Sequence, residues 1–486
     1  MIVLLLEENK VAHDDKIIKE SMKCHHNEIT EYFLNNAIEK EYSCDTFAIK
    51  YYNFEFFPKS LESKSLFYYL CKYDYYFLVE TLLNSTDIFI NYFEPEKLDL
   101  PLILGNTSIT PIISALFHNL IRKNPIHAAA KRKNLDVLEL LLSQDGIKTN
   151  NFCFFNCNEI EKIIIPSSVT SIGEGAFSGC KSLLKIENHS SITSIKSYSF
   201  SDCLSLAQIT IPSSVTTIEK FAFSRCKSLI TIAIPSSVTS INDYAFEKCY
   251  SLKQVLIPSS VKSIGNNAFI DCASLLQISI PSKVTIIKNG TFCDCNSLQQ
   301  ISIPSTIKII ESDSFIRCFS LKQIKIPLFL TSIGSNSFSN CTSLTSITIP
   351  SSVKIIEDDT FNECKSLMKI IFSNPSSVTS IGDRSFSECS SLLQMFIPSS
   401  CKSIGHYAFH NCKSLKQITI PVSLVSIGNS SFNRCKSLTQ ISIPSSVTSI
   451  GQNAFYGCSH LTEISIPSQI NIQNLGIGSG VNIKRV

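Results

Sequence analysis

Apolar residues recur at fixed places along most of the chain, in a pattern that repeats every 23 residues. The consensus unit reads Pro-x-Ser-Val-x-x-Ile, then a small residue before Phe, and then Cys-x-Ser-Leu followed by x-x-Ile-x-Ile. Successive units keep the 23-residue step, apart from one step of 25 that ends at Pro375. A unit this short cannot bury its own apolar groups, so the pattern predicts units that stack into a solenoid around one continuous core.

Thirteen units can be followed through the phenylalanine that each contains. These residues are Phe177, Phe200, Phe223, Phe246, Phe269, Phe292, Phe315, Phe338, Phe361, Phe386, Phe409, Phe432 and Phe455. Within one unit the positions expected to face the core are Leu206, Ile209, Ile211, Val215, Ile218 and Phe223. The Ile-x-Ile segment predicts a short strand with both isoleucines inward and their neighbours outward. The proline that follows should end the strand, because it has no backbone N–H to donate.

A cysteine stands three residues after each of these phenylalanines and accounts for thirteen of the 20 cysteines. Two interpretations are open: buried reduced thiols that pack as small apolar groups, or disulfides and metal sites between units. In-register side chains on neighbouring coils point alongside one another and not toward one another. This geometry favours reduced packing, which in turn favours a reducing compartment.

The chain before the array has a different, helical pattern. The stretch "NPIHAAAKRKNLDVLELLLSQDGIKTN" resembles an ankyrin unit, with Pro125 to His127 in the turn and Ala129 and Ala130 in the first helix. We therefore expect an α+β repeat protein, in which a helical ankyrin-like stack precedes a leucine-rich-repeat solenoid with a parallel sheet of short strands. The expected boundaries are a helical cap region at 1–60, degenerate ankyrin-like repeats at 61–150, the solenoid at 151–470 with an insertion near 373–374, and a C-terminal cap or tail at 471–486.

The array over residues 159–470 resembles the BspA-like, or Treponema-type, leucine-rich repeats of bacteria and trichomonad protists. Such a resemblance implies the solenoid fold. It also implies the role of a surface antigen or adhesin that binds host or cell-surface proteins, although a fold does not fix a function.

Charge and hydropathy exclude several classes of function. The formal net charge is +3, with 43 basic and 40 acidic residues and no long block of one sign, so nucleic acid is not expected as a partner. The opening "MIVLLLEENK" is too short and too acidic for a signal peptide, and no run approaches the ~20 apolar residues of a membrane span. The sequence by itself thus indicates a cytoplasmic protein, whereas the resemblance suggests the cell surface.

No catalytic constellation can be recognised, so we expect no enzyme activity, no cofactor and no catalytic or metal site. His406, His410 and Cys412 come close together in sequence, but Cys412 fills a core position and the histidines fill variable outward positions. The "GCKS" at 179–182 is ordinary repeat sequence and not a phosphate-binding loop.

The outward positions of the strands describe the predicted binding surface. Most carry Gln, Ser or Thr, but Ile371 and Phe396 place an apolar pair on adjacent units beside the insertion "FSNPSS". Such a pair is a candidate anchor for a protein partner, with local repacking as the alternative. The candidate partner-binding residues are Leu256, Lys325, Ile371, Phe396, Gln394 and Gln417. The expected function is non-enzymatic protein–protein interaction, as an adhesin or, alternatively, as an intracellular scaffold; the oligomeric state stays open.

Overall fold

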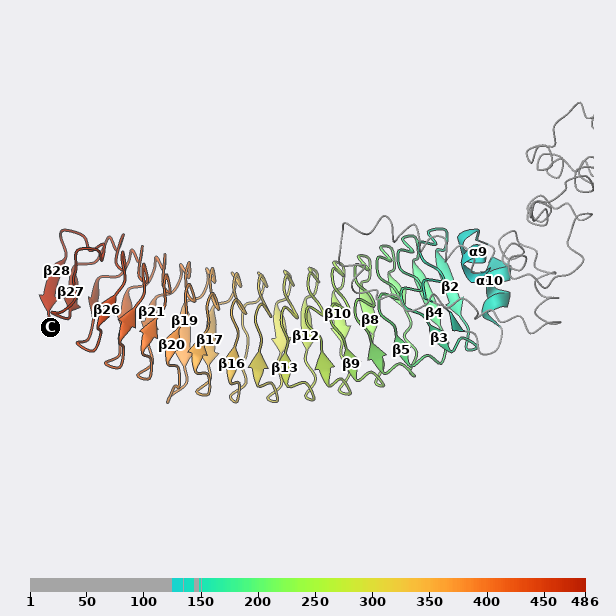
Figure 1. Ribbon diagram of the computed structural model, residues 1–486, viewed down its shortest axis with the longest axis horizontal. Helices are drawn as coiled ribbons and strands as arrows, with labels where there is room; N and C mark the ends of the chain where they lie inside the picture. Colours follow the sequence, from blue (N-terminus) through green and yellow to red (C-terminus); the bar gives the residue numbers. More distant parts are fainter. Residues whose placement is uncertain (1–124, 134, 144–147, 150) are drawn as a thin grey trace, which may run out of the picture.

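The computed structural model describes residues 125–133, 135–143, 148–149 and 151–486. These residues form a single stack of coils that follows a shallow arc, with α9 and α10 at one end and β28 at the other (Figure 1). Each regular coil contributes two short strands. One strand contains the Ile-x-Ile segment and is called here a main strand; the other follows the proline turn and is called a return strand.

The main strands lie at a common position in successive coils. They are β2 (Lys162–Ile165), β4 (Lys185–Asn188), β6 (Gln208–Ile209), β8 (Thr231–Ala233), β10 (Gln254–Leu256), β12 (Gln277–Ser279), β14 (Gln300–Ser302), β17 (Ser346–Ile349), β19 (Lys369–Phe372), β21 (Gln394–Phe396), β23 (Gln417–Thr419), β25 (Gln440–Ser442), β27 (Glu463–Ile466) and β28 (Asn482–Arg485). Their pairing is parallel and in register, so that Ile278 lies beside Ile301 of the next coil. Inward residues such as Ile278 are buried and their neighbours are exposed, which confirms the predicted alternation.

The return strands form a second parallel arrangement on the other side of the core. They are β1 (Lys148–Thr149), β3 (Ser171–Ile172), β5 (Ser194–Ile195), β7 (Thr217–Ile218), β9 (Ser240–Ile241), β11 (Ser263–Ile264), β13 (Ile286–Ile287), β15 (Ile309–Ile310), β16 (Ser332–Ile333), β18 (Ile355–Ile356), β20 (Ser380–Ile381), β22 (Ser403–Ile404), β24 (Ser426–Ile427) and β26 (Ser449–Ile450). Main strands run toward the lower edge of the stack in Figure 1, and return strands run back toward the upper edge. The proline turns therefore make one edge, named the Pro edge, and the phenylalanine turns make the opposite one.

Phenylalanine rings form a continuous ladder inside the phenylalanine turns. Neighbouring rings are stacked nearly parallel, as for Phe246 and Phe269, whose centroids lie 5.2 Å apart at an interplanar angle of 5°. The ladder begins one coil earlier than the thirteen units read from the sequence, because Phe154 stacks on Phe177 at 4.4 Å. The segment around Phe154 is thus a coil of the solenoid itself, and its Cys157 occupies the cysteine position.

The cysteines form a second ladder beside the rings. Their thiols are free and buried, and each Sγ–H donates to the carbonyl of the phenylalanine in the preceding coil. Cys318 donates to Phe292 at 3.2 Å, and the same contact recurs from Cys180 to Cys458. The thiol is therefore more than a small apolar filler, because it gives a second donor to a buried carbonyl that already accepts the backbone N–H of the cysteine in its own coil, as Phe292 does from Cys295 at 3.2 Å.

Left-handed backbone occurs at two positions in each phenylalanine turn, two residues before and two residues after the ring. In the coil of Phe200 these positions are Tyr198 and Asp202, with φ of 57° and 59°. The backbone N–H groups of Tyr198, Phe200 and Asp202 all donate to carbonyls of the next coil, at 2.8 to 3.1 Å. Glycines that follow the second isoleucine, such as Gly265, are not left-handed. The left-handed residues thus orient every second N–H group of the phenylalanine turn along the stack axis, toward the next coil.

Serine hydroxyls make a third ladder at the Pro edge. In most Pro-Ser-Ser-Val turns the second serine donates to the carbonyl of the apolar residue in the preceding coil, as Ser260 does to Val238 at 2.6 Å, whereas the hydroxyl of Ser446 has no such partner. Ser237 donates to Val215 and Ser400 to Val378 in the same way. These side chains explain the recurrence of serine at that position, because each satisfies a carbonyl that the turn cannot pair with backbone.

The two-residue insertion lies in one proline turn, between β19 and β20. The neighbouring return strands keep their register across it, with Ile356 beside Ile381. The ring ladder also continues, since Phe361 and Phe386 are stacked at 5.4 Å. The insertion therefore lengthens the turn and leaves the core undisturbed.

Two helices close the N-terminal end of the stack, α9 (Pro125–Lys131) and α10 (Leu135–Leu142). Ile126, Leu138 and Leu141 are buried in the same apolar cluster as the solenoid core. A helix pair is what the ankyrin-like pattern predicts for this segment. The other predicted ankyrin-like units and the cap region at 1–60 lie outside the described residues.

The other end is closed by the last residues of the chain. β28 pairs with β27 and so adds a strand after the final regular coil. The backbone N–H of Phe455 donates to the carbonyl of Leu475 at 2.9 Å, and Leu475 is buried. Residues 471–486 thus cover the last ring of the ladder.

The serine ladder predicts different effects for two adjacent residues. Replacing Ser237 by Ala should lower the free energy of unfolding by about 1 kcal/mol, because the Val215 carbonyl loses its donor. Replacing the exposed neighbour Ser236 by Ala should change it by less than about 0.5 kcal/mol. Urea unfolding of both variants measures the difference, and equal effects would contradict this role of the second serine.

The cysteine ladder predicts a loss of stability in alkali. Burial raises the pKa of Cys364 to about 12, compared with 9.0 for an ordinary thiol, and raises the pKa of the other ladder thiols as well. Above pH 9 the unfolded chain loses these protons first, so the free energy of unfolding should fall as the pH rises from about 9 toward about 12.

Thermal unfolding at several pH values between about 8 and 11 tests this dependence. The control is a variant with Cys341 and Cys364 replaced by Ala, which carries fewer shifted thiols but the same lysines and tyrosines. Its stability should decline less steeply with pH. An unchanged slope would show that the ladder thiols do not cause the decline.

Candidate functional site

The outward side chains of the main strands form an extended surface, named here the strand face. One of its columns consists largely of glutamine, including Gln254, Gln277, Gln394 and Gln417. Among the described residues, no side-chain hydrogen bond links one glutamine of this column to the next. The amides thus do not form a side-chain ladder along the stack, and their donors and acceptors face solvent.

An apolar cluster interrupts this polar surface on β19 and β21 and in the residues just before them. The cluster consists of Met368, Ile371, Leu393 and Phe396, whose exposed fractions are 47%, 40%, 47% and 54%. Met368 and Leu393 lie side by side, because the N–H of Leu393 donates to the Met368 carbonyl at 3.4 Å. These four residues are named the 368–396 cluster.

Strand alternation fixes the direction of this cluster. Ile370 and Met395 occupy the inward positions of their strands and are buried, so Ile371 and Phe396 must face outward. Beside the cluster, Gln394 lies opposite Gln417 and Phe396 lies opposite Thr419. Exposed Lys369 and Lys416 stand at its border. The arrangement is an apolar centre with an amide and ammonium rim.

The remaining two predicted residues lie elsewhere on the strand face. Leu256 on β10 is 69% exposed and borders a shallow hollow lined by residues of β10, β12 and β14. Lys325 is exposed on a coil between this hollow and the 368–396 cluster. Five coils separate Leu256 from Ile371, a distance of about 25 Å at the usual strand spacing. The structure therefore brings Ile371, Phe396, Gln394 and Gln417 together and leaves Leu256 and Lys325 apart from them.

Met368 and Leu393 were missed by the sequence reasoning. They stand two residues before the inward isoleucine position, just before the strand that the Ile-x-Ile segment predicts. Reading that column would have found them, since Gln299, Lys322 and Lys416 fill it in other units. Leu184, Ile230 and Leu276 also occupy this column, so the missing signal is that Met368 and Leu393 lie on adjacent coils beside the outward Ile371 and Phe396.

The histidines near Cys412 do not converge. Cys412 is buried and donates to the Phe386 carbonyl at 3.2 Å. His406 is exposed, and its Nδ1 accepts from the N–H of Asn429 at 2.8 Å. Desolvation lowers the pKa of His410, whose Nε2 lies 3.9 Å from the Glu388 carboxylate. In the described part of the chain no group of three or more His, Cys, Asp or Glu residues is arranged to hold a metal ion.

The described helices are short, and none has the length and apolar character needed to cross a bilayer.

Comparison with known families and structures identifies the repeat. The family model described as "BspA type Leucine rich repeat region (6 copies)" matches residues 147–276, 262–393 and 366–483. No curated protein matches the chain. The match begins at residue 147, so the ankyrin-like units at 61–150 stay a prediction.

Several solved structures are similar to this chain, and the first of them shows the same fold. A leucine-rich repeat protein from Bacteroides ovatus ATCC 8483 is 31% identical, with a TM-score of 0.57; the alignment covers 67% of this chain and 92% of that one. A leucine rich cell surface protein from Faecalibacterium prausnitzii A2-165 is 27% identical over 67% of this chain and 88% of its own, with a TM-score of 0.43. The pneumococcal vaccine antigen PcpA is 20% identical over 67% and 78% of the two chains, with a TM-score of 0.37.

These relatives are repeat proteins of a non-catalytic scaffold type, and leucine-rich repeat proteins generally bind protein partners. The family match and the alignment with the Bacteroides structure both cover the coils that carry the Phe, Cys and Ile ladders described above. The chain belongs to the family of BspA-type leucine-rich repeat proteins.

Proposed function

We propose that this protein is a non-enzymatic binding protein that holds a partner protein on its strand face, with the 368–396 cluster as the anchor. The observation that carries the proposal is the exposed apolar cluster itself. Phe396 is 54% exposed on a strand whose inward neighbour Met395 is buried, so the ring is held outward by the alternation of a rigid sheet.

The composition of the site suits a protein partner. Hot spots of protein interfaces are typically a few large side chains at the centre of the contact, surrounded by polar residues that exclude water. Phe396, Leu393, Met368 and Ile371 would supply the centre. The rim would be supplied by residues such as Gln394 and Gln417, whose amides are exposed and can donate and accept hydrogen bonds.

The setting of this binding is part of the proposal. The resemblance to BspA-like proteins favours a surface antigen or adhesin that contacts host or cell-surface proteins. The alternative is an intracellular scaffold, which the free thiols of the core favour. Labelling of intact cells with a membrane-impermeant reagent separates the two: labelled protein supports the adhesin, and protein that is labelled only after lysis supports the scaffold.

Substitutions in the 368–396 cluster test the binding site. A photo-crosslinker placed at Gln394 should capture the partner, which can then be purified and its affinity measured. Replacing Ile371 and Phe396 together by Ser should weaken that affinity on the order of tenfold or more, because the apolar centre of the contact is lost. The exposed side chains contribute little to the core, so thermal stability should stay nearly unchanged.

Val422 offers a matched control. It is 83% exposed and lies at the Pro edge, away from the strand face. Replacing it by Ser removes an exposed apolar side chain elsewhere on the solenoid and should leave the affinity within about twofold. An equal loss for both variants, or no loss for the Ile371 and Phe396 variant, would refute the proposed anchor.

A further inference from the structure

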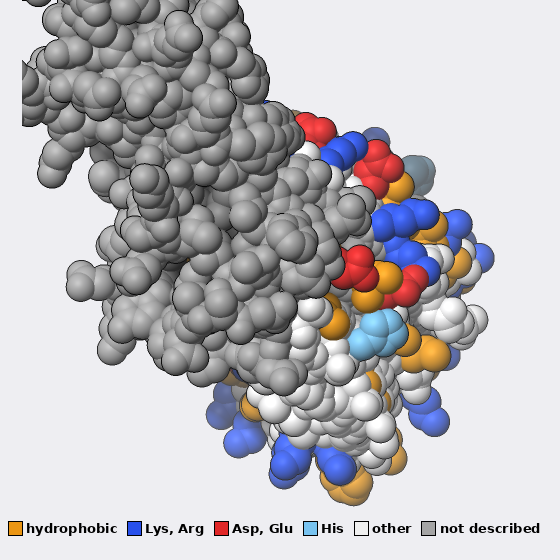
Figure 2. All heavy atoms as spheres, turned by 90° about the vertical axis from the view of Figure 1, so that its right-hand side faces the viewer, with side chains coloured by type: hydrophobic (Ala, Val, Ile, Leu, Met, Phe, Trp, Pro, Cys, Tyr) orange, Lys and Arg blue, Asp and Glu red, His pale blue; other side chains and the backbone are white. Residues whose placement is uncertain are grey.

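Charge is strongly segregated around the cross-section of the solenoid. Between residues 190 and 460, all fourteen acidic residues fall in the phenylalanine turns, within the seven positions from four before to two after the ring. Eight basic residues share these positions. The remaining surface of the same coils carries fourteen lysines and no acidic residue. In Figure 2 the visible acidic side chains lie in the upper part of the end view, whereas the lower rim shows only basic charged groups.

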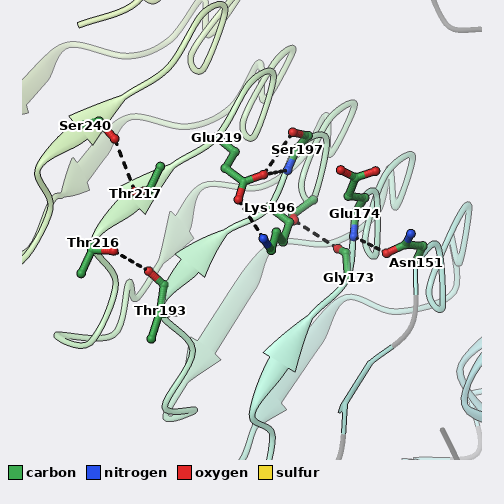
Figure 3. Close-up of polar contacts among 11 residues, drawn as sticks. Asn151, Gly173, Glu174, Thr193, Lys196, Ser197, Thr216, Thr217, Glu219 and Ser240 are labelled. Carbon is green, nitrogen blue, oxygen red and sulfur yellow. Dashed lines mark hydrogen bonds and ion pairs between the residues drawn. The ribbon is translucent and has the colours of Figure 1, made fainter. Parts of the chain in front are cut away.

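Most charges in the phenylalanine turns are neutralised locally. Lys196 lies 3.0 Å from Glu219, whose carboxylate also accepts from Ser197 (Figure 3). Arg225 pairs with Asp202 across neighbouring coils, and Arg384 pairs with Asp359. Fourteen acidic against eight basic residues still leave a surplus of six negative charges, so this edge should repel an anionic ligand.

The Pro edge has the opposite character. From Pro166 to Asn471, the five positions that begin at each proline hold no Asp or Glu. Lys262, Lys308, Lys354 and Lys402 occupy the last of these positions in alternate coils, and all four are exposed. Within the described residues, no carboxylate lies at ion-pair distance from any of the four ammonium groups. Lys283 adds a fifth exposed cation to the same edge.

Backbone hydrogen bonds hold this column at a regular spacing. The N–H of Thr331 donates to the Lys308 carbonyl, and the N–H of Lys402 donates to the Thr379 carbonyl, both at 2.8 Å. Two coils correspond to about 10 Å at the usual strand spacing, so the four lysines form a row of about 30 Å. The row is rigid at its backbone and unneutralised at its tips.

Hydroxyl groups fill the intervals in the row. Thr331 and Thr379 lie between the lysines, and their hydroxyls donate to the carbonyls of Lys308 and Lys354 at 3.0 and 3.2 Å. Their oxygen lone pairs can still accept a hydrogen bond from a ligand. Thr193 and Thr216 make the same contact in an earlier part of the column, visible in Figure 3.

We infer that the Pro edge binds a linear anionic polysaccharide along the row of Lys262, Lys308, Lys354 and Lys402. A glycan whose disaccharide carries one carboxylate and one sulfate group, as in chondroitin sulfate, repeats each kind of anion at an interval comparable to two coils. Its hydroxyl groups can donate to the threonine oxygens between the lysines. This surface is distinct from the strand face, so its ligand does not depend on the protein-binding function proposed above.

Other polyanions fit the row less well. Single-stranded nucleic acid is usually bound with several aromatic platforms interleaved with cations, and arginine is the preferred partner of phosphate. From Lys262 to Lys402 the Pro edge holds one exposed aromatic ring, Phe329, and no arginine. The carboxylates of an acidic peptide would have to recur at the two-coil spacing of the lysines, which corresponds to about three residues of extended chain. In a β-strand, residues three apart point to opposite faces, so only a polyproline II conformation would place them all toward the row. Repeat length and hydroxyl content thus favour the glycan.

Binding of the full chain to chondroitin sulfate tests the inference, with neutral dextran as the negative control. Wild-type protein should bind chondroitin sulfate, and the affinity should fall as salt is added, because exposed charges are screened. Replacing Lys262, Lys308, Lys354 and Lys402 by Gln should weaken binding on the order of tenfold or more, while circular dichroism and thermal stability stay unchanged.

Two matched variants separate the row from net charge. The first replaces Lys181, Lys227, Lys413 and Lys436 by Gln, which removes the same charge from exposed positions outside the Pro edge. Its affinity for chondroitin sulfate should fall by less than about twofold. The second variant keeps the amino-acid composition but changes the spacing of the lysines along the Pro edge. It combines K308T with T331K and K402T with T379K. It should bind several-fold more weakly than wild type, because the two-coil interval is broken.

Several outcomes would overturn the inference. They are absence of chondroitin sulfate binding by wild type, equal losses in the two lysine-to-glutamine variants, and full affinity in the shifted variant. Polyglutamate or single-stranded DNA bound as tightly as chondroitin sulfate would show a general attraction for polyanions and no glycan site. Selective loss of glycan binding in the row and shifted variants supports it.

Discussion

Backbone hydrogen bonds between neighbouring coils are the constraint on which the rest of this structure depends. Each coil has N–H groups at its main strand, its return strand and its phenylalanine turn that find acceptors only in an adjacent coil. A buried donor without an acceptor costs free energy, so a lone coil would not fold. The same requirement explains the two ends of the stack, where α9 and α10 on one side and β28 on the other cover coils that have a neighbour on one side only.

Side chains add further hydrogen bonds between neighbouring coils at the turns. The phenylalanine carbonyl of one coil accepts a hydrogen bond from the cysteine thiol of the next coil. The carbonyl of the apolar residue in the proline turn accepts a hydrogen bond from a serine hydroxyl of the next coil. Cysteine suits its position because it combines an apolar body with a donor that reaches across the coil spacing. The recurrence of Cys and Ser in the repeat is therefore a matter of hydrogen bonding as well as of size. A disulfide or metal ladder would require these sulfurs to turn away from the carbonyls that they contact.

The sequence predicted the core well and the surface less well, for a physical reason. Inward positions such as Ile278 and Phe246 are apolar in every unit, because burial leaves few alternatives, and so their period is easily read. The left-handed positions were missed because residues such as Tyr198 and Arg225 occupy them in place of glycine, their conformation being imposed by the pairing of the coils. The charge segregation was also missed: acidic residues are scattered along the chain and come together on one edge only after the coils are stacked.

The turn that absorbs two extra residues before β20 has a consequence for how such proteins diversify. Because the return strands and the ring ladder keep their register across it, the length of this loop is decoupled from the rest of the coil. Natural selection can thus add or remove residues at this edge without a cost to the apolar ladders. Descendants of one array could acquire different loops, and with them different ligands, while they inherit an unchanged scaffold.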